Sequence, residues 1–278
     1  MERLPSMRTA DTKDPRFTYD IEANMDIREV GEEIFDGIAV HDIDVLGATG
    51  RRVSSYLVTP VKGAALPGVV LVHPLPGNRK SFLNEALNLV ERRICSITVD
   101  APWSGGMEWA KKIGDPVNDR KEFIGAIKDL RRSFDVLTSL SKIDPDRLGY
   151  VGHSLGALCG AVLSGIDRRA KAYVLMSGTS SFSEVATVNV PSLDEAKIAR
   201  YRQIMSDIDP VQFVSHASPA RIMFQMGKTE EYFGLRNRQA LAVAASEPKD
   251  VRWYDAGHML NEQARQDRDR WLEQELFR

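Results

Sequence analysis

Hydrophobic and polar residues alternate along two early segments of the chain. The segments GIAVHDIDVL (37–46) and RRVSSYLVTP (51–60) show this alternation on either side of the turn sequence GATG. A period of two residues is typical of a strand with one buried face, and a short turn brings two such strands side by side. The pattern therefore predicts an antiparallel hairpin.

Short, largely apolar runs replace this alternation further along the chain. They are GVVLVH (68–73), ICSITVD (94–100), DRLGYVG (146–152), AKAYVLMSG (170–178), ARIMFQMG (220–227) and DVRWYD (250–255). Such runs are typical of strands buried on both faces, as in the centre of a parallel sheet.

Helical patterns lie between these runs. Ser81 is the expected cap of a helix that carries Leu83 and Val90, and further helices are expected over 119–141 and 259–277. Strands that alternate with helices predict the α/β class, with a mostly parallel sheet covered on both faces. Ligands of such sheets bind outside the carboxyl ends of the strands, so the chemistry is expected at that edge.

Two segments depart from the alternation. Residues 1–37 form an N-terminal extension with a weak helical pattern over 20–36, and we expect it to be partly helical. Residues 179–219 separate two strands by about forty residues, far more than an ordinary crossover loop. We interpret this segment as a small helical lid over the site, inserted into one domain that covers residues 38–278.

Composition narrows the possible partners. The chain has 278 residues, of which 43% are hydrophobic, and a net charge of −2, so neither nucleic acid nor a membrane surface is an expected partner. No apolar run is long enough to cross a bilayer, and the polar start lacks the apolar core of a secretory signal. Cys95 and Cys159 lie in apparent core segments and are expected to be buried free thiols. We therefore expect a cytoplasmic protein, and a homodimer is left open.

The motif that carries chemistry follows the run 146–152. Gly152-His153-Ser154-Leu155-Gly156 matches the pattern G-x-S-x-G of a nucleophile elbow, and it stands between a predicted strand and a predicted helix. A serine at this sharp turn has a strained backbone, and the flanking glycines avoid collisions with the neighbouring strand and helix. The pattern predicts Ser154 as a nucleophile.

A serine hydroxyl needs a base near neutral pH. His258 is the preferred candidate because it lies in WYDAGHML, on a glycine-containing loop just past the last predicted strand. His41 lies in the first hairpin and His216 in the lid, so a structural or surface role is expected for each. His153 adjoins the nucleophile but is expected to point elsewhere. His73 ends its strand and is expected to orient the next loop by hydrogen bonding.

The base in turn needs a carboxylate that fixes its tautomer. The segment FQMGKTEEYFG follows the strand 220–227 and offers two glutamates. Glu230 is the preferred acid, Glu231 is the reserve, and Asp255 is third because it lies too close in sequence to His258 to reach round it. The order serine, acid, histidine is the one found in nucleophile-elbow hydrolases.

The loop after the strand 68–73 is rich in proline. Attack on an ester carbonyl creates an oxyanion, which backbone N–H groups must stabilise. The amide of Leu155, directly after the nucleophile, is one expected donor. Pro74 and Pro76 have no N–H, which leaves Leu75 as the second expected donor and Gly77 as the alternative.

With these motifs in order, the chain resembles the α/β-hydrolases, and within them the dienelactone-hydrolase-like and carboxylesterase branches. The resemblance covers about residues 38–278 and rests on HPLPG, DAPWSGG, GHSLG, GKTEE and AGH. It implies an eight-stranded sheet and a triad at Ser154, Glu230 and His258. Dienelactone hydrolases proper use a cysteine nucleophile, many relatives have glycine where this chain has Pro74, and the family's acid is more often aspartate.

Aromatic and apolar residues in loops at the carboxyl edge are candidates for contact with the substrate: Trp103, Tyr232, Phe233 and Met259. They favour small to medium apolar acyl or aryl esters. No metal or nucleotide motif occurs, and no cofactor is expected.

The leading interpretation is a serine carboxylesterase that forms an acyl-enzyme. A serine peptidase or thioesterase of the same fold is an alternative, because the same triad serves all three. A non-catalytic ligand-binding protein on this scaffold is a further alternative.

Overall fold

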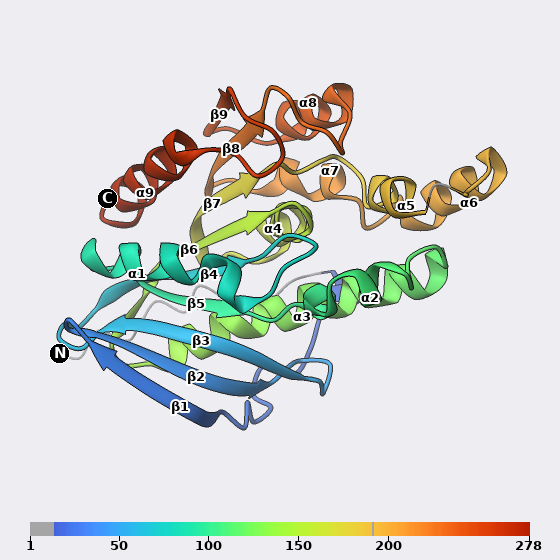
Figure 1. Cartoon of the computed structure of the whole chain (residues 1–278). Helices are drawn as coiled ribbons and strands as arrows, with labels where there is room; N and C mark the ends of the chain where they lie inside the picture. The colour runs from blue at the N-terminus through green and yellow to red at the C-terminus, as the bar shows by residue number, and fades with distance from the viewer. Residues whose placement is uncertain (1–13, 191) are drawn as a thin grey trace.

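The structure is a computed structural model that describes residues 14–190 and 192–278. A nine-stranded sheet in the order β1-β2-β3-β5-β4-β6-β7-β8-β9 runs through these residues (Figure 1). The strands are β1 Arg28–Phe35, β2 Ile38–Leu46, β3 Arg52–Pro60, β4 Leu66–Val72, β5 Cys95–Val99, β6 Ile143–His153, β7 Ala170–Met176, β8 Arg221–Gly227 and β9 Lys249–Tyr254.

The two halves of the sheet differ as their sequences predict. β1, β2 and β3 are antiparallel, and β3 pairs antiparallel with β5. The strands from β5 to β9 are parallel to one another. Each of the six apolar runs forms one of these parallel strands, and the alternating segments form the β2–β3 hairpin. The predicted α/β class is confirmed, although the sheet has nine strands and not eight.

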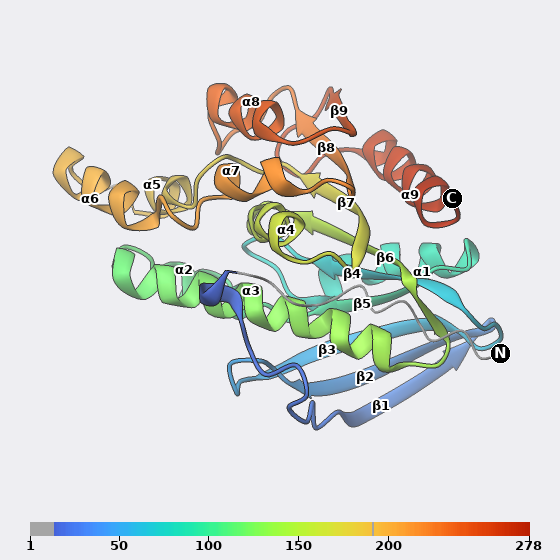
Figure 2. The same ribbon diagram turned by 180° about the vertical axis from the view of Figure 1, so that it is seen from behind.

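Helices cover both faces of the sheet (Figure 2). The α-helices are α1 Leu83–Glu91, α2 Met107–Ala110, α3 Pro116–Ser139, α4 Leu155–Ile166, α5 Ser183–Asn189, α6 Glu195–Met205, α7 Pro210–Phe213, α8 Leu235–Ala244 and α9 Glu262–Leu276. Short 3₁₀ helices cover Pro15–Phe17, Arg79–Phe82, Pro102–Gly105 and Val214–His216. Apolar residues of α1 and α9 pack in one core on one face, and those of α3, α4 and α8 pack in a larger core on the other.

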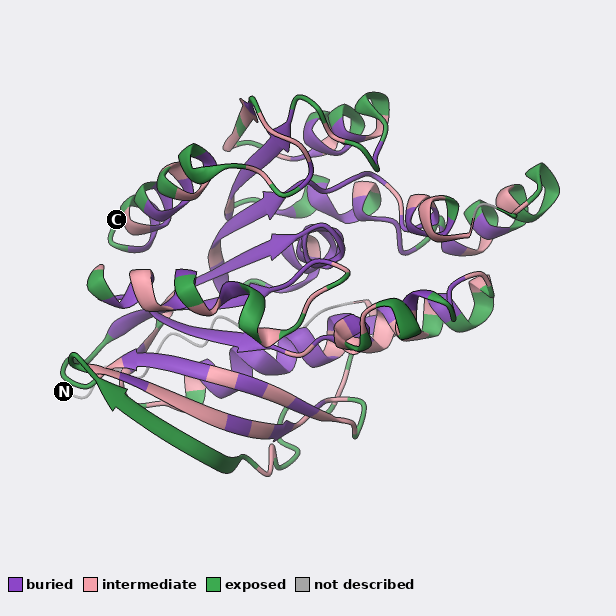
Figure 3. Cartoon of the chain, viewed as in Figure 1, coloured by how far each residue is buried: buried purple, intermediate pink, exposed green. Residues whose placement is uncertain are grey.

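The N-terminal extension differs from its prediction. The helix expected over 20–36 is absent from the described residues, and Arg28–Phe35 pairs with β2 as the edge strand β1. All eight residues of β1 are exposed (Figure 3), so no buried helical face existed to support the weak helical pattern. Phe17 is buried against the larger core. Residues 1–13 of the extension lie outside the described residues.

A second difference concerns the start of α1. Asn78, and not Ser81, is the capping residue, because its side chain accepts a hydrogen bond from the amide of Lys80 and begins a 3₁₀ turn. Ser81 is the third residue of that turn and accepts a hydrogen bond from the amide of Asn78 at 3.1 Å. The two residues form a reciprocal capping box that leads into α1.

The insertion at 179–219 is helical. α5, α6 and α7 lie between β7 and β8, and α5 and α6 extend beyond the end of the sheet at which the parallel strands terminate (Figure 1). Tyr201 of α6 donates a hydrogen bond to Asp119 of α3 at 2.9 Å, and both residues are buried. This contact fixes α6 against the first turn of α3.

Candidate active site

Ser154 lies at the sharp turn between β6 and α4. Its backbone angles, φ 55° and ψ −115°, are sterically unfavourable for a residue with a Cβ. Gly152 and Gly156 make the turn possible, since a Cβ on Gly152 would lie 2.2 Å from the carbonyl oxygen of Gly156, and one on Gly156 would lie 2.4 Å from that of Val72. The amide of Ser154 donates to the carbonyl of Met176 at 2.8 Å and holds the turn against β7. These features define a nucleophile elbow.

Leu155 is the first residue of α4. The amides of the first helical turn have no partner within their own helix, and the helix dipole gives that end a partial positive charge. The N–H of Leu155 therefore lies directly after the serine, at the partly positive end of α4.

His258 and Glu230 form a direct pair, although 28 residues separate them. Nδ1 of His258 lies 2.8 Å from one carboxylate oxygen of Glu230 and 2.9 Å from the other. Both side chains are buried, with 7% of the histidine and none of the glutamate exposed. Glu230 follows β8 and His258 follows β9, so two neighbouring parallel strands deliver them to the same edge. The pair fixes Nδ1 as the protonated nitrogen and leaves Nε2 as an acceptor.

The carboxylate of Glu230 is held in its ionised form. Burial alone would raise its pKa, but the hydrogen bond and charge of His258, with the amides of Tyr232 and Phe233, lower the pKa below its usual value. The amide of Tyr232 donates to Glu230 at 2.9 Å and that of Phe233 at 3.4 Å. An ionised acid at this position stabilises a protonated imidazole.

Glu231, the reserve acid, contacts the backbone of the same histidine. One of its carboxylate oxygens accepts a hydrogen bond from the amide of His258 at 2.9 Å. The contact is close because residue 257 is glycine: a Cβ there would lie 2.3 Å from the other carboxylate oxygen. The two adjacent glutamates thus bind different parts of the same histidine: Glu230 binds its ring and Glu231 binds its main chain.

The carbonyl oxygen of His258 is also fixed. It accepts hydrogen bonds from Nε2 of His153 at 2.8 Å and from Oγ of Ser177 at 2.7 Å. Sequence reasoning missed both contacts. His153 stands out in the sequence only as the neighbour of the nucleophile, and Ser177 follows β7 without a motif of its own.

His73 sets the orientation of the proline-rich loop. Its Nε2 accepts a hydrogen bond from the amide of Ala101 at 3.2 Å, so Nδ1 carries the proton and donates to the carbonyl of Pro74 at 2.8 Å. The C=O of Pro74 and the N–H of Leu75 belong to one trans peptide and point in opposite directions. The N–H of Leu75 therefore points away from the ring of His73, and the expected hydrogen bond from His73 to its loop is confirmed.

The four residues expected to contact substrate divide into two groups. Tyr232 and Met259 are 56% and 68% exposed, and the ring of Tyr232 lies 4.9 Å from that of His258. Trp103 is fully buried, and its Nε1 donates to the carbonyl of His73 at 3.0 Å. Phe233 is also buried and packs edge-on against His258. Both rings are buried in the described structure, so contact of Trp103 and Phe233 with substrate stays a prediction.

The remaining histidines lie away from this arrangement. His41 of β2 faces Glu29 and Glu32 of β1 at 3.6 and 3.5 Å, and His216 is exposed after α7. Within residues 14–190 and 192–278, no cluster of three or more histidine, cysteine or acidic side chains is arranged to hold a metal ion. Across the same ranges, no helix combines the length and the apolar character that a membrane span requires.

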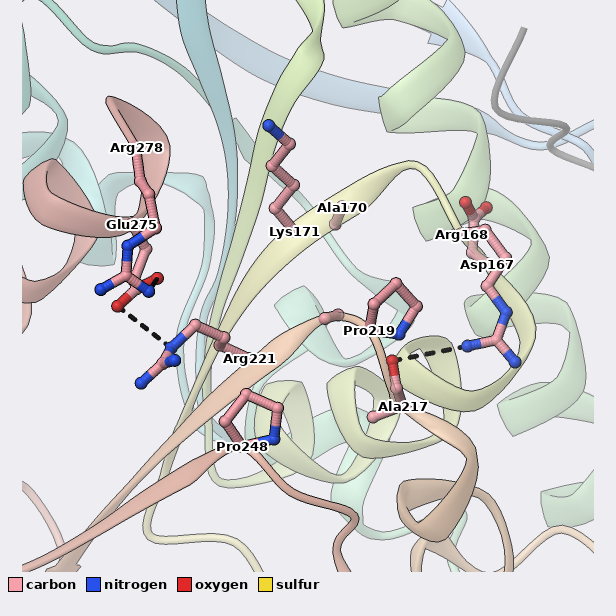
Figure 4. A pocket seen from close by; sticks show the side chains of 11 residues that line it. Asp167, Arg168, Ala170, Lys171, Ala217, Pro219, Arg221, Pro248, Glu275 and Arg278 are labelled. Carbon is pink, nitrogen blue, oxygen red and sulfur yellow. Dashed lines mark hydrogen bonds and ion pairs between the residues drawn. The ribbon is translucent and has the colours of Figure 1, made fainter.

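A cavity of about 370 Å³ lies at the end of the sheet where the parallel strands β7 and β8 begin, and Figure 4 shows the residues that line it. Its charged groups do not converge. Arg221 pairs with Glu275 at one end, while Arg168 at the other donates to the carbonyl of Ala217 (Figure 4). The start of β8 contributes Arg221, whereas the elbow stands at the far ends of the parallel strands. This cavity is separate from the candidate active site.

At the level of sequence, no family model matches the chain. Two curated Mycobacterium tuberculosis proteins, both described as uncharacterized, are 25% identical to it over 211 residues, which is 76% of this chain and 69% of theirs.

Solved structures resemble the whole fold. An acetyl xylan esterase from Paenibacillus sp. R4 has a TM-score of 0.75 at 20% identity and covers 90% of this chain and 88% of its own. Acetyl xylan esterase 1 from Thermoanaerobacterium sp. JW/SL YS485 has a TM-score of 0.75 at 16% identity, with 92% and 89% covered. A 2,6-dihydroxy-pseudo-oxynicotine hydrolase has a TM-score of 0.64 at 17% identity, with 88% and 67% covered. Together with the sheet order and the elbow, these likenesses identify the α/β-hydrolase fold.

Proposed function

We propose that this protein is a serine hydrolase that cleaves carboxylic esters. Ser154 is the nucleophile, His258 the base and Glu230 the acid. The observation that carries the proposal is the combination of a strained serine at the elbow with a buried histidine–carboxylate pair at the same edge of the sheet. The resemblance to solved esterases, which extends over most of the chain, supports the same reaction.

The reaction follows from the roles of these groups. Oγ of Ser154 attacks the ester carbonyl carbon while Nε2 of His258 takes the hydroxyl proton. The tetrahedral intermediate collapses, the bond to the alcohol oxygen breaks, and Nε2 returns the proton to that oxygen. A water molecule then attacks the acyl-serine with His258 again as base, and the carboxylic acid leaves as Ser154 regains its proton. Glu230 keeps Nδ1 protonated throughout and stabilises the imidazolium formed in each step.

The oxyanion is assigned to two backbone amides. The N–H of Leu155 begins α4 beside the nucleophile, and the N–H of Leu75 points away from the ring of His73, which binds the carbonyl at the other end of the same peptide. Removing one preorganised donor of this kind lowers kcat by a factor of about 10²–10³. Pro74 and Pro76 restrict the loop on both sides of Leu75 and so favour a single orientation of its amide.

We further propose a small to medium apolar ester as substrate. Tyr232 and Met259 flank His258 and expose apolar surface beside it, which suits an acyl or aryl group. Both cysteines are free and buried, which fits a reaction in the reducing cytoplasm.

A fluorophosphonate probe tests the proposal without knowledge of the substrate. The probe phosphonylates an activated serine, and peptide mass spectrometry locates the adduct. We expect stoichiometric labelling at Ser154, its loss in Ser154→Ala, and hydrolysis of short-chain aryl esters by the wild-type protein. Well-folded wild-type protein that is not labelled would overturn the proposal and favour a ligand-binding role. A preference for thioesters or amides over matched esters would move the assignment to a thioesterase or peptidase.

A further inference from the structure

The carbonyl oxygen of His258 lies between two buried donors. His153 Nε2 is 2.8 Å away and Ser177 Oγ is 2.7 Å away. His153 is 2% exposed and Ser177 is fully buried. Because a carbonyl can only accept, Nε2 of His153 carries a proton. The two donors form a clamp on the main chain of the proposed base, in addition to the contacts that Glu230 and Glu231 make with it.

His153 is an uncharged hydrogen-bond donor at neutral pH. Burial is the main cause, with the nearby ring of His258 second, and together they lower the pKa of His153 to about 3. The two rings are 5.0 Å apart and tilted by 31°. Arg268 and Glu230 are the other charged groups that act on His153, and Arg268 is itself paired with Glu85. A neutral His153 adds no positive charge beside the imidazolium that His258 becomes during the reaction.

The clamp joins two parts of the site that are distant in sequence. His153 directly precedes Ser154 and belongs to β6 in the centre of the sheet, while His258 lies on a loop after β9 at its edge. Groups that react must be held within about 0.5 Å and 10–20° of their productive positions. The hydrogen bond from the ring of His153 therefore holds the loop that carries the base against the central strand β6.

We propose that His153 is a positioning residue for this reaction, and that its Nε2–H fixes His258 relative to Ser154 through the carbonyl of His258. The inference rests on the proposed function. It assigns no proton transfer to His153, and its role is the geometry of the residue it holds. Ser177 shares that role through the same acceptor.

Two substitutions separate the hydrogen bond from the volume of the side chain. His153→Leu fills similar space without a donor, whereas His153→Gln offers an N–H about as far along the side chain as Nε2. We expect His153→Leu to lower kcat about 10–100-fold, since small displacements of a base have costs of this size. KM should change by less than about threefold, because His153 is buried and its Nε2 is bonded to the carbonyl of His258. His153→Gln should recover most of kcat.

The rate of fluorophosphonate labelling gives a second measurement. Labelling needs only the nucleophile and its base, so it should slow in His153→Leu in parallel with kcat. Ser177→Ala should slow it less, and the double variant should lose less than the product of the two single effects because both donors share one acceptor. Val151→Ala is the matched control: Val151 is a buried β6 residue outside the clamp, so this variant should lower the melting temperature and leave kcat per labelled site unchanged.

The outcomes distinguish the two proposals. Wild-type protein that is not labelled would overturn the proposed function and this inference with it. Labelled wild type with equal labelling rates in His153→Leu and Val151→Ala would overturn the positioning role alone. If His153→Leu does not fold, Ser177→Ala and His153→Gln decide: slower labelling in the first with near-normal rates in the second supports the clamp, and unchanged rates in Ser177→Ala overturn it.

Discussion

Glu231 binds the main chain of His258: its carboxylate accepts a hydrogen bond from the histidine amide at 2.9 Å. The adjacent Glu230 binds Nδ1 of the same histidine. Two consecutive acidic residues therefore make different contacts with one histidine. Their substitutions should have different consequences for catalysis.

Glu230→Gln should lower kcat by about 10³–10⁴, because an amide no longer enforces the required tautomer or stabilises the imidazolium. Glu231→Gln should cost less than about tenfold, since its side-chain carbonyl can still accept from the amide of His258. Steady-state kinetics on one aryl ester compare the two, each serving as the other's control. A larger loss in Glu231→Gln than in Glu230→Gln would assign the acid to Glu231.

The loop that presents Leu75 depends on His73. His73→Phe removes the donor to the carbonyl of Pro74 and keeps an aromatic ring against Trp103. We expect kcat to fall by about 10–100-fold, less than the 10²–10³ for a lost oxyanion donor, because the Leu75 amide would still be present but no longer fixed.

Gly77→Ala tests the same peptide from the other side. A Cβ at Gly77 would lie 2.6 Å from the carbonyl oxygen of Pro74, so the carbonyl must move. We expect kcat to fall here also, with a smaller change in KM. Full activity in both His73→Phe and Gly77→Ala would remove Leu75 from the oxyanion site.

The aromatic residues near the site should separate into two classes. Trp103→Phe removes the hydrogen bond to the carbonyl of His73 and should lower the free energy of unfolding by about 1–3 kcal/mol, as for a buried polar group left without its partner. Tyr232→Ala should leave stability nearly unchanged and raise KM for aryl esters, since its ring is exposed beside His258. Urea unfolding and a KM series over acyl chain length measure the two effects. A raised KM for Trp103→Phe with unchanged stability would contradict the burial of Trp103.

Much of this architecture follows from local sequence. The period of two in 37–46 and 51–60 and the apolar runs further along predict the hairpin and the parallel strands. The elbow is predictable because the sharp turn leaves no room for a Cβ on either side of Ser154, and the motif therefore contains glycine at both positions. Glu230 and His258 are predictable as candidates because each follows a strand at the same edge.

What escaped prediction depends on tertiary contacts. β1 has no buried face, so its pairing with β2 leaves no hydrophobic period to detect. The burial of Trp103 and Phe233 could not be predicted from the sequence, because it depends on the apolar layer that loops at the end of a sheet need beneath them. The clamp on His258 joins residues 105 positions apart through a main-chain carbonyl. No side-chain pattern marks such a contact.

The burial of His153 has a consequence for stability as a function of pH. Its pKa is lowered from 6.5 to about 3 in the folded protein, first by burial and then by His258. Between these values the unfolded chain binds a proton that the folded protein does not, so stability falls as the pH is lowered. From pH 7 to pH 5 this single group should account for a loss of about 2 kcal/mol in the free energy of unfolding. His153→Gln should lack that part of the loss, while His216→Gln, at an exposed position, should retain it. Urea unfolding of the three proteins at both pH values measures the difference. An equal loss in the free energy of unfolding between the two pH values for wild type and His153→Gln would show that His153 does not stay neutral in the folded protein.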